Sequence, residues 1–132
     1  MKLLKESVHV VMLNEYNELL AVSRKDNHYD MGLVGGKVDE DDRSLKDAII
    51  REIKEETGLN VRKKDLHRIF QTHKYGYMGY TFLCTKYSGK IQTDEPHIVK
   101  WTCFNEVIKG SFGKYNKLVY ECLVDMDVKA IL

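Results

Sequence analysis

The 132-residue sequence predicts a mixed α/β (α+β) fold. Three observations support this class: several short runs are rich in β-branched residues, one segment carries helix signals at both ends, and a second amphipathic segment lies near the C-terminus. The length is that of one domain, so residues 1–132 are expected to form a single domain with one core.

Six strands are expected where apolar and β-branched runs are separated by turn-forming residues. In the first run the apolar residues do not alternate with polar ones, which indicates burial on both faces of a sheet. The third run ends at the double glycine Gly35-Gly36. The expected strands cover residues 7–13, 18–23, 31–34, 66–74, 80–87 and 97–104.

Residues 44–57 carry the clearest helix signals. Ser44 is a suitable N-cap, and Asp47 three residues later makes a pair that resembles a capping box. Gly58 follows the last turn, where a left-handed residue commonly ends a helix. A second helix is expected over residues 114–124. Its predicted apolar face consists of Leu118, Val119, Cys122 and Leu123.

Composition and charge exclude several classes of protein. The net charge is +1, so no overall field recruits nucleic acid or an anionic membrane, and neither is expected as a partner. No stretch approaches the roughly 20 apolar residues of a membrane span, and the N-terminal apolar run is too short for a signal peptide. The three cysteines are widely spaced, so we expect reduced thiols in a cytoplasmic protein and no zinc site. The oligomeric state, including a homodimer, stays open.

The apolar stripe of the main helix becomes acidic halfway along. Burying unpaired carboxylates costs on the order of several kcal/mol each, and acids one turn apart repel each other. Oxygen ligands favour Mg²⁺ or Mn²⁺, so this face is a candidate site for divalent metal ions. The alternative is a solvated acidic patch, although the helix dipole disfavours acids at that end. The stripe begins with Leu45, Ala48 and Ile49, and the same face continues with Glu52, Glu55 and Glu56.

Residues 51–59 read Arg-Glu-Ile-Lys-Glu-Glu-Thr-Gly-Leu and, together with Gly36, closely resemble the Nudix box. That motif is glycine, five residues, glutamate, seven residues, then Arg-Glu-U-x-Glu-Glu-x-Gly-U, where U is a bulky aliphatic residue. The second half matches at every fixed position. The first half departs, because the intervening loop is one residue longer than the motif. Its glutamate position falls on Arg43 when counted back from Arg51, and on Asp42 when counted forward from Gly36, so its occupant stays open.

This resemblance implies a Nudix-type α/β/α sandwich around a central mixed sheet. It also implies a pyrophosphohydrolase that cleaves a nucleoside diphosphate linked to another group. The short chain favours conversion of a nucleoside triphosphate, or a modified form of one, to the monophosphate and pyrophosphate. Hydrolysis of dinucleoside polyphosphates or of ADP-ribose is the alternative within the same enzyme class. A non-catalytic regulator that binds nucleotides on the same fold is the alternative outside it.

The resemblance further implies the residues of a metal site. Its ligands would be the carbonyl oxygen of Gly36 and the carboxylates of Glu52, Glu55 and Glu56, with Mg²⁺ or Mn²⁺ as the cofactor. Catalytic roles fall on Glu52, Glu55 and Arg51. Glu55 is expected as a third ligand or as a base acting through water, and Arg51 should hold a glutamate in position. Which glutamate deprotonates the water stays open, and an ordinary surface ion pair is the alternative for Arg51.

Substrate contacts are expected from side chains that flank this motif. Arg24, Lys25 and Lys37 could hold phosphate oxygens. A ring of the aromatic, glycine-containing segment 75–80 could stack on a base, and Tyr77 is the candidate there. Solvated loop cations and a tyrosine in a hairpin turn are the alternatives. Glu95 or Asp94 could offer a further acid, although an ordinary turn role is favoured there.

Overall fold

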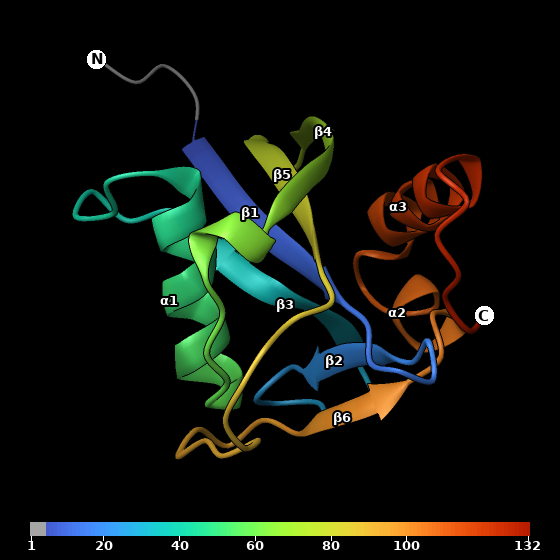
Figure 1. Ribbon diagram of the computed structural model, residues 1–132, viewed down its shortest axis with the longest axis horizontal. Coiled ribbons are helices and arrows are strands. Elements are labelled where there is room, and N and C mark those ends of the chain that lie inside the picture. Colours follow the sequence, from blue (N-terminus) through green and yellow to red (C-terminus); the bar gives the residue numbers. More distant parts are fainter. Residues whose placement is uncertain (1–4) are drawn as a thin grey trace.

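A computed structural model describes residues 5–132, without the side chain of Lys74 (Figure 1). Six strands and three α-helices follow one another along this part of the chain, with one short 3-10 turn. In order they are β1 (Lys5–Met12), β2 (Leu19–Ser23), β3 (Met31–Lys37), α1 (Leu45–Thr57), the 3-10 turn (Lys63–Asp65), β4 (His67–Lys74), β5 (Tyr77–Cys84), β6 (Val99–Thr102), α2 (Asn105–Ile108) and α3 (Gly113–Asp125).

The six strands form one mixed sheet in the order β4-β5-β1-β3-β2-β6. β1 runs parallel to β5, and the other neighbouring pairs are antiparallel. Helix α1 covers one face of the sheet, and α2 and α3 cover the other (Figure 1). The expected α/β/α sandwich with a central mixed sheet is therefore confirmed. No helix among residues 5–132 is long and apolar enough to cross a membrane.

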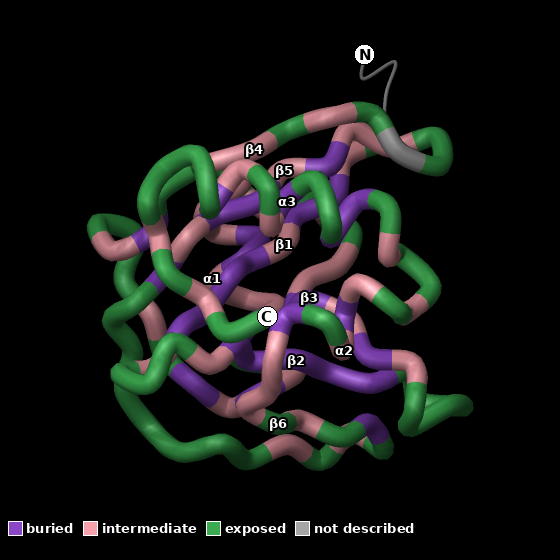
Figure 2. The backbone as a smooth tube through the Cα atoms, turned by 90° about the vertical axis from the view of Figure 1, so that its right-hand side faces the viewer, coloured by how far each residue is buried: buried purple, intermediate pink, exposed green. Residues whose placement is uncertain are grey.

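β1 lies between two apolar cores, as the lack of clean alternation among its apolar residues predicts. Val8, Val10 and Met12 point to the core beneath α1, whereas Val11 belongs to the core beneath α2 and α3. All four side chains are fully buried. Figure 2 shows the buried positions concentrated along the central strands, with exposed loops around them. Because period-two alternation sends neighbouring side chains to opposite faces, the consecutive apolar residues Val10, Val11 and Met12 supply both cores.

The main helix has the caps that the sequence predicts. The Ser44 hydroxyl accepts the backbone N–H of Asp47 at 3.1 Å and donates to the Asp47 carboxylate at 3.0 Å. Gly58 ends the helix with φ 81°, and its N–H bonds the carbonyl of Lys54. A Cβ on Gly58 would also lie 2.3 Å from the carbonyl oxygen of Gln92, so glycine is needed there for space as well as for backbone conformation.

The bounds of β3 and β5 differ by three residues from the sequence-based expectation. β3 does not end at residue 34 but continues through the double glycine, where Val8 pairs with Gly36 and Ser7 with Lys37. β5 begins at Tyr77 and ends at Cys84, earlier than the expected 80–87. The reason is the tight turn before it, whose two central residues have φ values of 49° and 81°, so that pairing resumes at once.

The C-terminal region also differs from the sequence-based expectation. β6 stops at Thr102 because the short helix α2, which the sequence did not predict, begins at Asn105. In α3 the prediction that Leu118 faces the core is wrong, since that residue is 47% exposed. The buried face is rotated because the first turn of the helix packs its own residues inward. That face consists of Tyr115, Asn116, Val119 and Leu123.

Candidate active site

The double glycine at the end of β3 lies directly against the acidic turn of α1. A Cβ added to Gly36 would sit 2.6 Å from a carboxylate oxygen of Glu52, and one added to Gly35 would sit 2.1 Å from the carbonyl oxygen of Val8. The Gly35 N–H donates to the Glu56 carboxylate at 2.8 Å. Glycine at position 36 therefore lets the Glu52 carboxylate approach the backbone of β3, and glycine at position 35 lets β3 lie close to the backbone of β1.

Arg51 ties the loop before α1 to the acidic face. Its guanidinium donates to both carboxylate oxygens of Asp42, at 3.0 Å and 2.9 Å. It also donates to Glu52 at 3.0 Å and to Glu55 at 3.3 Å. A further bond reaches the carbonyl of Lys37 at 3.2 Å. Hydrogen bonding to Asp42 and the charge of Glu52 raise the pKa of Arg51, which stays a permanent cation among these acids.

These contacts bear on the irregular first half of the motif. The Asp42 side chain is only 7% exposed. It forms a bidentate ion pair with Arg51, which is stronger than a single hydrogen bond between a carboxylate and a guanidinium. Arg43 is exposed. The one-residue insertion therefore brings Asp42, counted forward from Gly36, to the arginine. The sequence had left both positions open because it does not show how the longer loop folds.

The three glutamates of α1 lie in different environments. Burial raises the pKa of Glu52, and the charge of Arg51 opposes that shift. Burial also raises the pKa of Glu56 to about 8, and repulsion from Glu52, Glu95 and Glu55 adds to the increase. Glu55 does not point inward as expected. Its side chain is 50% exposed and pairs with Arg51 at the solvent-exposed edge of the acidic turn.

The donor set fits a hard divalent cation. Glu52 and Glu56 lie one turn apart with little exposure to solvent, and their charges repel each other. A cation near the two carboxylates and the Gly36 backbone would offset this repulsion, and oxygen atoms are the ligands that Mg²⁺ and Mn²⁺ prefer. In the described range 5–132, no three acid, histidine or cysteine side chains converge as a finished cage, since Arg51 draws Glu55 outward. The ligand assignments stay a prediction.

The loop of residues 92–97 packs against the C-terminal end of α1. The Thr93 hydroxyl donates to the carbonyl of Glu55 at 3.2 Å, and the Gln92 N–H donates to that of Thr57 at 2.8 Å. The His97 ring bonds the carbonyl of Glu56 at 2.7 Å. These groups satisfy carbonyls that a helix end otherwise leaves unpaired.

The same loop brings a further acid to the site. Glu95 lies close enough to raise the pKa of Glu56, although the sequence favoured an ordinary turn role for it. Lys25 bonds Glu95 at 2.9 Å, and this bond lowers the pKa of the Glu95 carboxyl. Lys25, which the sequence suggested for phosphate contacts, is thus paired with an acid of this site.

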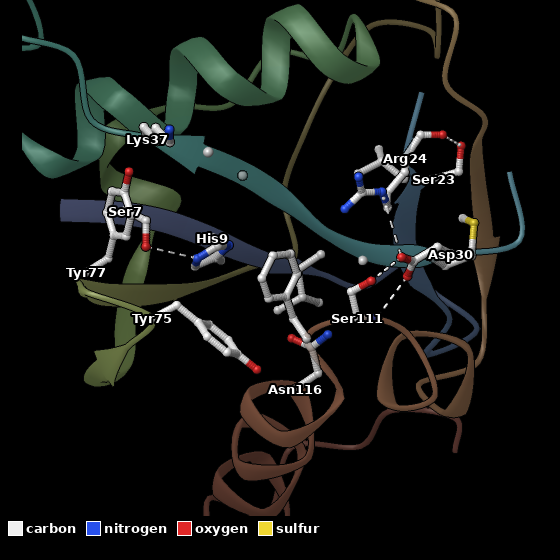
Figure 3. Close-up of a pocket in the computed structure, with 17 residues that line it drawn as sticks. Ser7, His9, Ser23, Arg24, Asp30, Lys37, Tyr75, Tyr77, Ser111 and Asn116 are labelled. Atoms are coloured by element: carbon white, nitrogen blue, oxygen red, sulfur yellow. Dashed lines mark hydrogen bonds and ion pairs between the residues drawn. The ribbon is translucent and has the colours of Figure 1, made fainter. Parts of the chain in front are cut away.

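A cavity of about 430 Å³ lies beside the double glycine, over the sheet and against the first turn of α3 (Figure 3). Gly35 and Gly36 line it, so the same two residues border both the cavity and the acidic turn. Of the four predicted substrate contacts, Arg24, Lys37 and Tyr77 line this cavity, whereas Lys25 does not. The Lys37 ammonium lies 5.6 Å from the centre of the Tyr77 ring, within the range of a cation–π contact. Their role in binding stays a prediction.

Sequence reasoning missed several polar residues of the cavity wall. Asn116 is 2% exposed, and its side-chain amide donates to the carbonyl of Val107 at 3.0 Å. His9 bonds the Ser7 hydroxyl at 3.3 Å and contacts the Tyr115 ring. The sequence carried one signal for Asn116. An asparagine on the apolar face of a helix is expected to be a buried polar group, and such groups require hydrogen-bond partners.

Comparisons with known proteins agree with this geometry. Residues 3–121 match the model of the NUDIX domain family. An 8-oxo-dGTP diphosphatase of Buchnera aphidicola subsp. Schizaphis graminum is 32% identical over 95 residues, which are 70% of each chain. A MutT structure from work on Aliivibrio salmonicida and Vibrio cholerae is similar with a TM-score of 0.74, 20% identity and coverage of 92% of this chain and 98% of the other.

A second solved structure widens the range of activities found on this fold. An ADP-ribose pyrophosphatase of Streptococcus suis is similar with a TM-score of 0.67 and 20% identity, over 97% of this chain and 96% of the other. At such identities the structural likeness concerns the fold alone. The family match and the Buchnera relative carry the assignment to a family.

Proposed function

Because this chain belongs to the Nudix family, we propose that it converts nucleoside triphosphates to the monophosphate and pyrophosphate, using Mg²⁺ or Mn²⁺. Membership makes the chain a hydrolase of phosphoric anhydride bonds, and the substrate and metal are inferred from the site. One observation carries this inference: Gly35 and Gly36 border both the cavity and the carboxylates of α1. A nucleoside in the cavity would place its phosphates at the acidic turn.

In this proposal, separate residues bind the metal, position its ligands and hold the phosphates. Glu52, Glu56 and the Gly36 carbonyl would hold the divalent ion, and Glu55 would act as a third ligand or as a base through water. The ion, when bound, would neutralise phosphate charge and lower the pKa of an attacking water. Arg51 would position Glu52 and Glu55, which it already contacts. Lys37 and Arg24, at the edge of the cavity, would hold phosphate oxygens.

The cavity favours a nucleoside as the group attached to the phosphates. Its wall combines apolar and aromatic surface with polar side chains, among them His9 and Asn116, and such a combination suits a small organic ligand that has both apolar and polar parts. The relative from Buchnera acts on 8-oxo-dGTP by its name. Purine triphosphates, including this oxidised form, are therefore the substrates we expect to be cleaved best.

The proposal is tested with a panel of nucleotides, in Mg²⁺, in Mn²⁺ and in EDTA, with the products separated by ion-exchange chromatography. We expect release of nucleoside monophosphate and pyrophosphate from a purine triphosphate, with no turnover in EDTA. Cleavage of ADP-ribose or dinucleoside polyphosphates alone would overturn the proposed substrate class. Tight nucleotide binding without turnover in either metal would favour the non-catalytic alternative.

A further inference from the structure

Two exposed aromatic side chains meet at the mouth of the cavity, although they come from distant segments. Tyr75 lies in the turn between β4 and β5 and is 66% exposed, and Phe112 immediately precedes α3 and is 43% exposed. Their ring centres are 5.8 Å apart, with an angle of 63° between the ring planes. Both residues line the cavity. Figure 3 shows the Tyr75 ring pointing from the hairpin toward α3.

The position of Phe112 is fixed by the residues before it. Asp30, at the start of β3, accepts the Ser111 N–H at 2.9 Å and also the Ser111 hydroxyl. A Cβ on Gly110 would lie 2.4 Å from the carbonyl oxygen of Met31, so the loop packs directly on β3. This close docking holds the Phe112 ring at one side of the opening.

Tyr75 occupies a turn position that its side chain does not favour. Its φ is 49°, and that of Gly76 is 81°. Two-residue hairpin turns with both residues in this region prefer asparagine, aspartate or glycine at the first position. A tyrosine there carries a conformational cost, and costs of this kind concentrate at binding and catalytic sites. The turn places a large ring at the opening where a small polar residue would suit the backbone better.

We propose that Tyr75 and Phe112 form an aromatic clamp for the nucleobase, which parts their rings on entry and then stacks on them. This inference rests on the proposed nucleotide substrate. Every base has a flat π-face, and a purine offers the larger one, so the clamp favours purines over pyrimidines. Stacking of a base on an aromatic side chain changes affinity by about 5- to 150-fold.

The test uses 2-aminopurine riboside triphosphate, whose fluorescence is quenched when the base stacks. The wild-type protein is expected to quench the probe, and Tyr75→Leu and Phe112→Leu should each lose most of the quenching. In each leucine variant, KM for purine triphosphates should rise about tenfold while kcat changes less than about twofold, because stacking is equal in ground and transition states. Tyr75→Phe keeps the ring and should keep both signals.

Tyr16→Leu is the matched control, since Tyr16 is 67% exposed in the turn after β1 and does not line the cavity. If the leucine variants quench the probe and bind purines like the wild type, the clamp is wrong while the proposed function stands. A fall in kcat at constant KM would also overturn the clamp. If no triphosphate is cleaved, the proposed function fails, and loss of probe quenching in Tyr75→Leu would still support the clamp.

Discussion

The acidic turn of α1 and the cavity border the same two glycines but differ in how the chain assembles them. The acidic turn comes from consecutive residues, Arg51 to Glu56, and its contacts are charged and tightly connected. The cavity gathers residues from four strands, from loops and from the start of α3, and much of its wall is apolar. In the proposed function, the residues for the reaction are thus mostly neighbours in sequence, whereas substrate selection would depend on contacts between segments far apart in sequence.

The largest effect is expected from Glu56→Gln, which replaces the predicted carboxylate ligand with an amide of the same shape that cannot take a negative charge. The loss of a metal ligand worth several kcal/mol corresponds to a fall in kcat of about a thousandfold. Steady-state kinetics with Mg²⁺ measures it. Glu121→Gln, on the exposed side of α3, is the charge-matched control and should leave kcat unchanged. Wild-type turnover by the Glu56 variant would refute the metal assignment.

Substitutions in the double glycine should separate the two regions. In Gly36→Ala the new methyl group displaces the Glu52 carboxylate, the movable end of a side chain, so kcat should fall about a hundredfold while the protein stays folded. In Gly35→Ala the methyl group meets the backbone of β1 at 2.1 Å, so the main effect should be on stability. Thermal melts and kinetics on both variants test this, and equal melting temperatures would contradict it.

The irregular loop of the motif gives the next effect. Asp42→Asn keeps the volume but weakens the paired contact with Arg51, and loss of such support around a metal site lowers activity by about 10- to 100-fold. Arg43→Gln should have almost no effect, because Arg43 is exposed. The reverse ranking in kcat/KM would mean that Arg43, and not Asp42, supports the site.

The cavity should respond differently from the acidic turn. Asn116→Leu removes a buried amide, so KM for the preferred nucleotide should rise about tenfold with kcat nearly unchanged. The carbonyl of Val107 loses its partner at the same time, so the free energy of unfolding should fall by about 1–3 kcal/mol. Chemical denaturation and a comparison of purine and pyrimidine triphosphates separate the two effects. A loss of kcat without a change in KM would contradict the proposal that the cavity binds the nucleotide and the acidic turn carries the reaction.

The smallest effect concerns stability without metal. Burial raises the pKa of Glu56 from its ordinary 4.5 to about 8 in the folded protein. Between these two values the unfolded chain releases its proton while the folded protein retains it, so stability falls as pH rises from about 4.5 to 8. In EDTA we expect the melting temperature to fall steadily as pH rises across this window. Glu56→Gln should reduce the drop, and an unchanged slope would contradict the assignment.

Much of the fold was predictable, because its signals are short in sequence. The cap at Ser44, the left-handed Gly58 and the apolar run of β1 each depend on neighbouring residues, and each is confirmed. The short helix α2 was missed, and the inner face of α3 was rotated in the prediction. Both depend on how the C-terminal region packs on the sheet, for which four residues of α2 carry too little pattern.

The sequence alone determined the acidic turn, since helical periodicity places residues 52 and 56 on one face whatever surrounds them. Only the tertiary structure decided that Asp42 reaches Arg51, that Glu55 lies at the solvent-exposed edge of the acidic turn, and that Tyr75 meets Phe112. These outcomes depend on loop length, strand register and close backbone approach, which bring together residues that no local pattern relates.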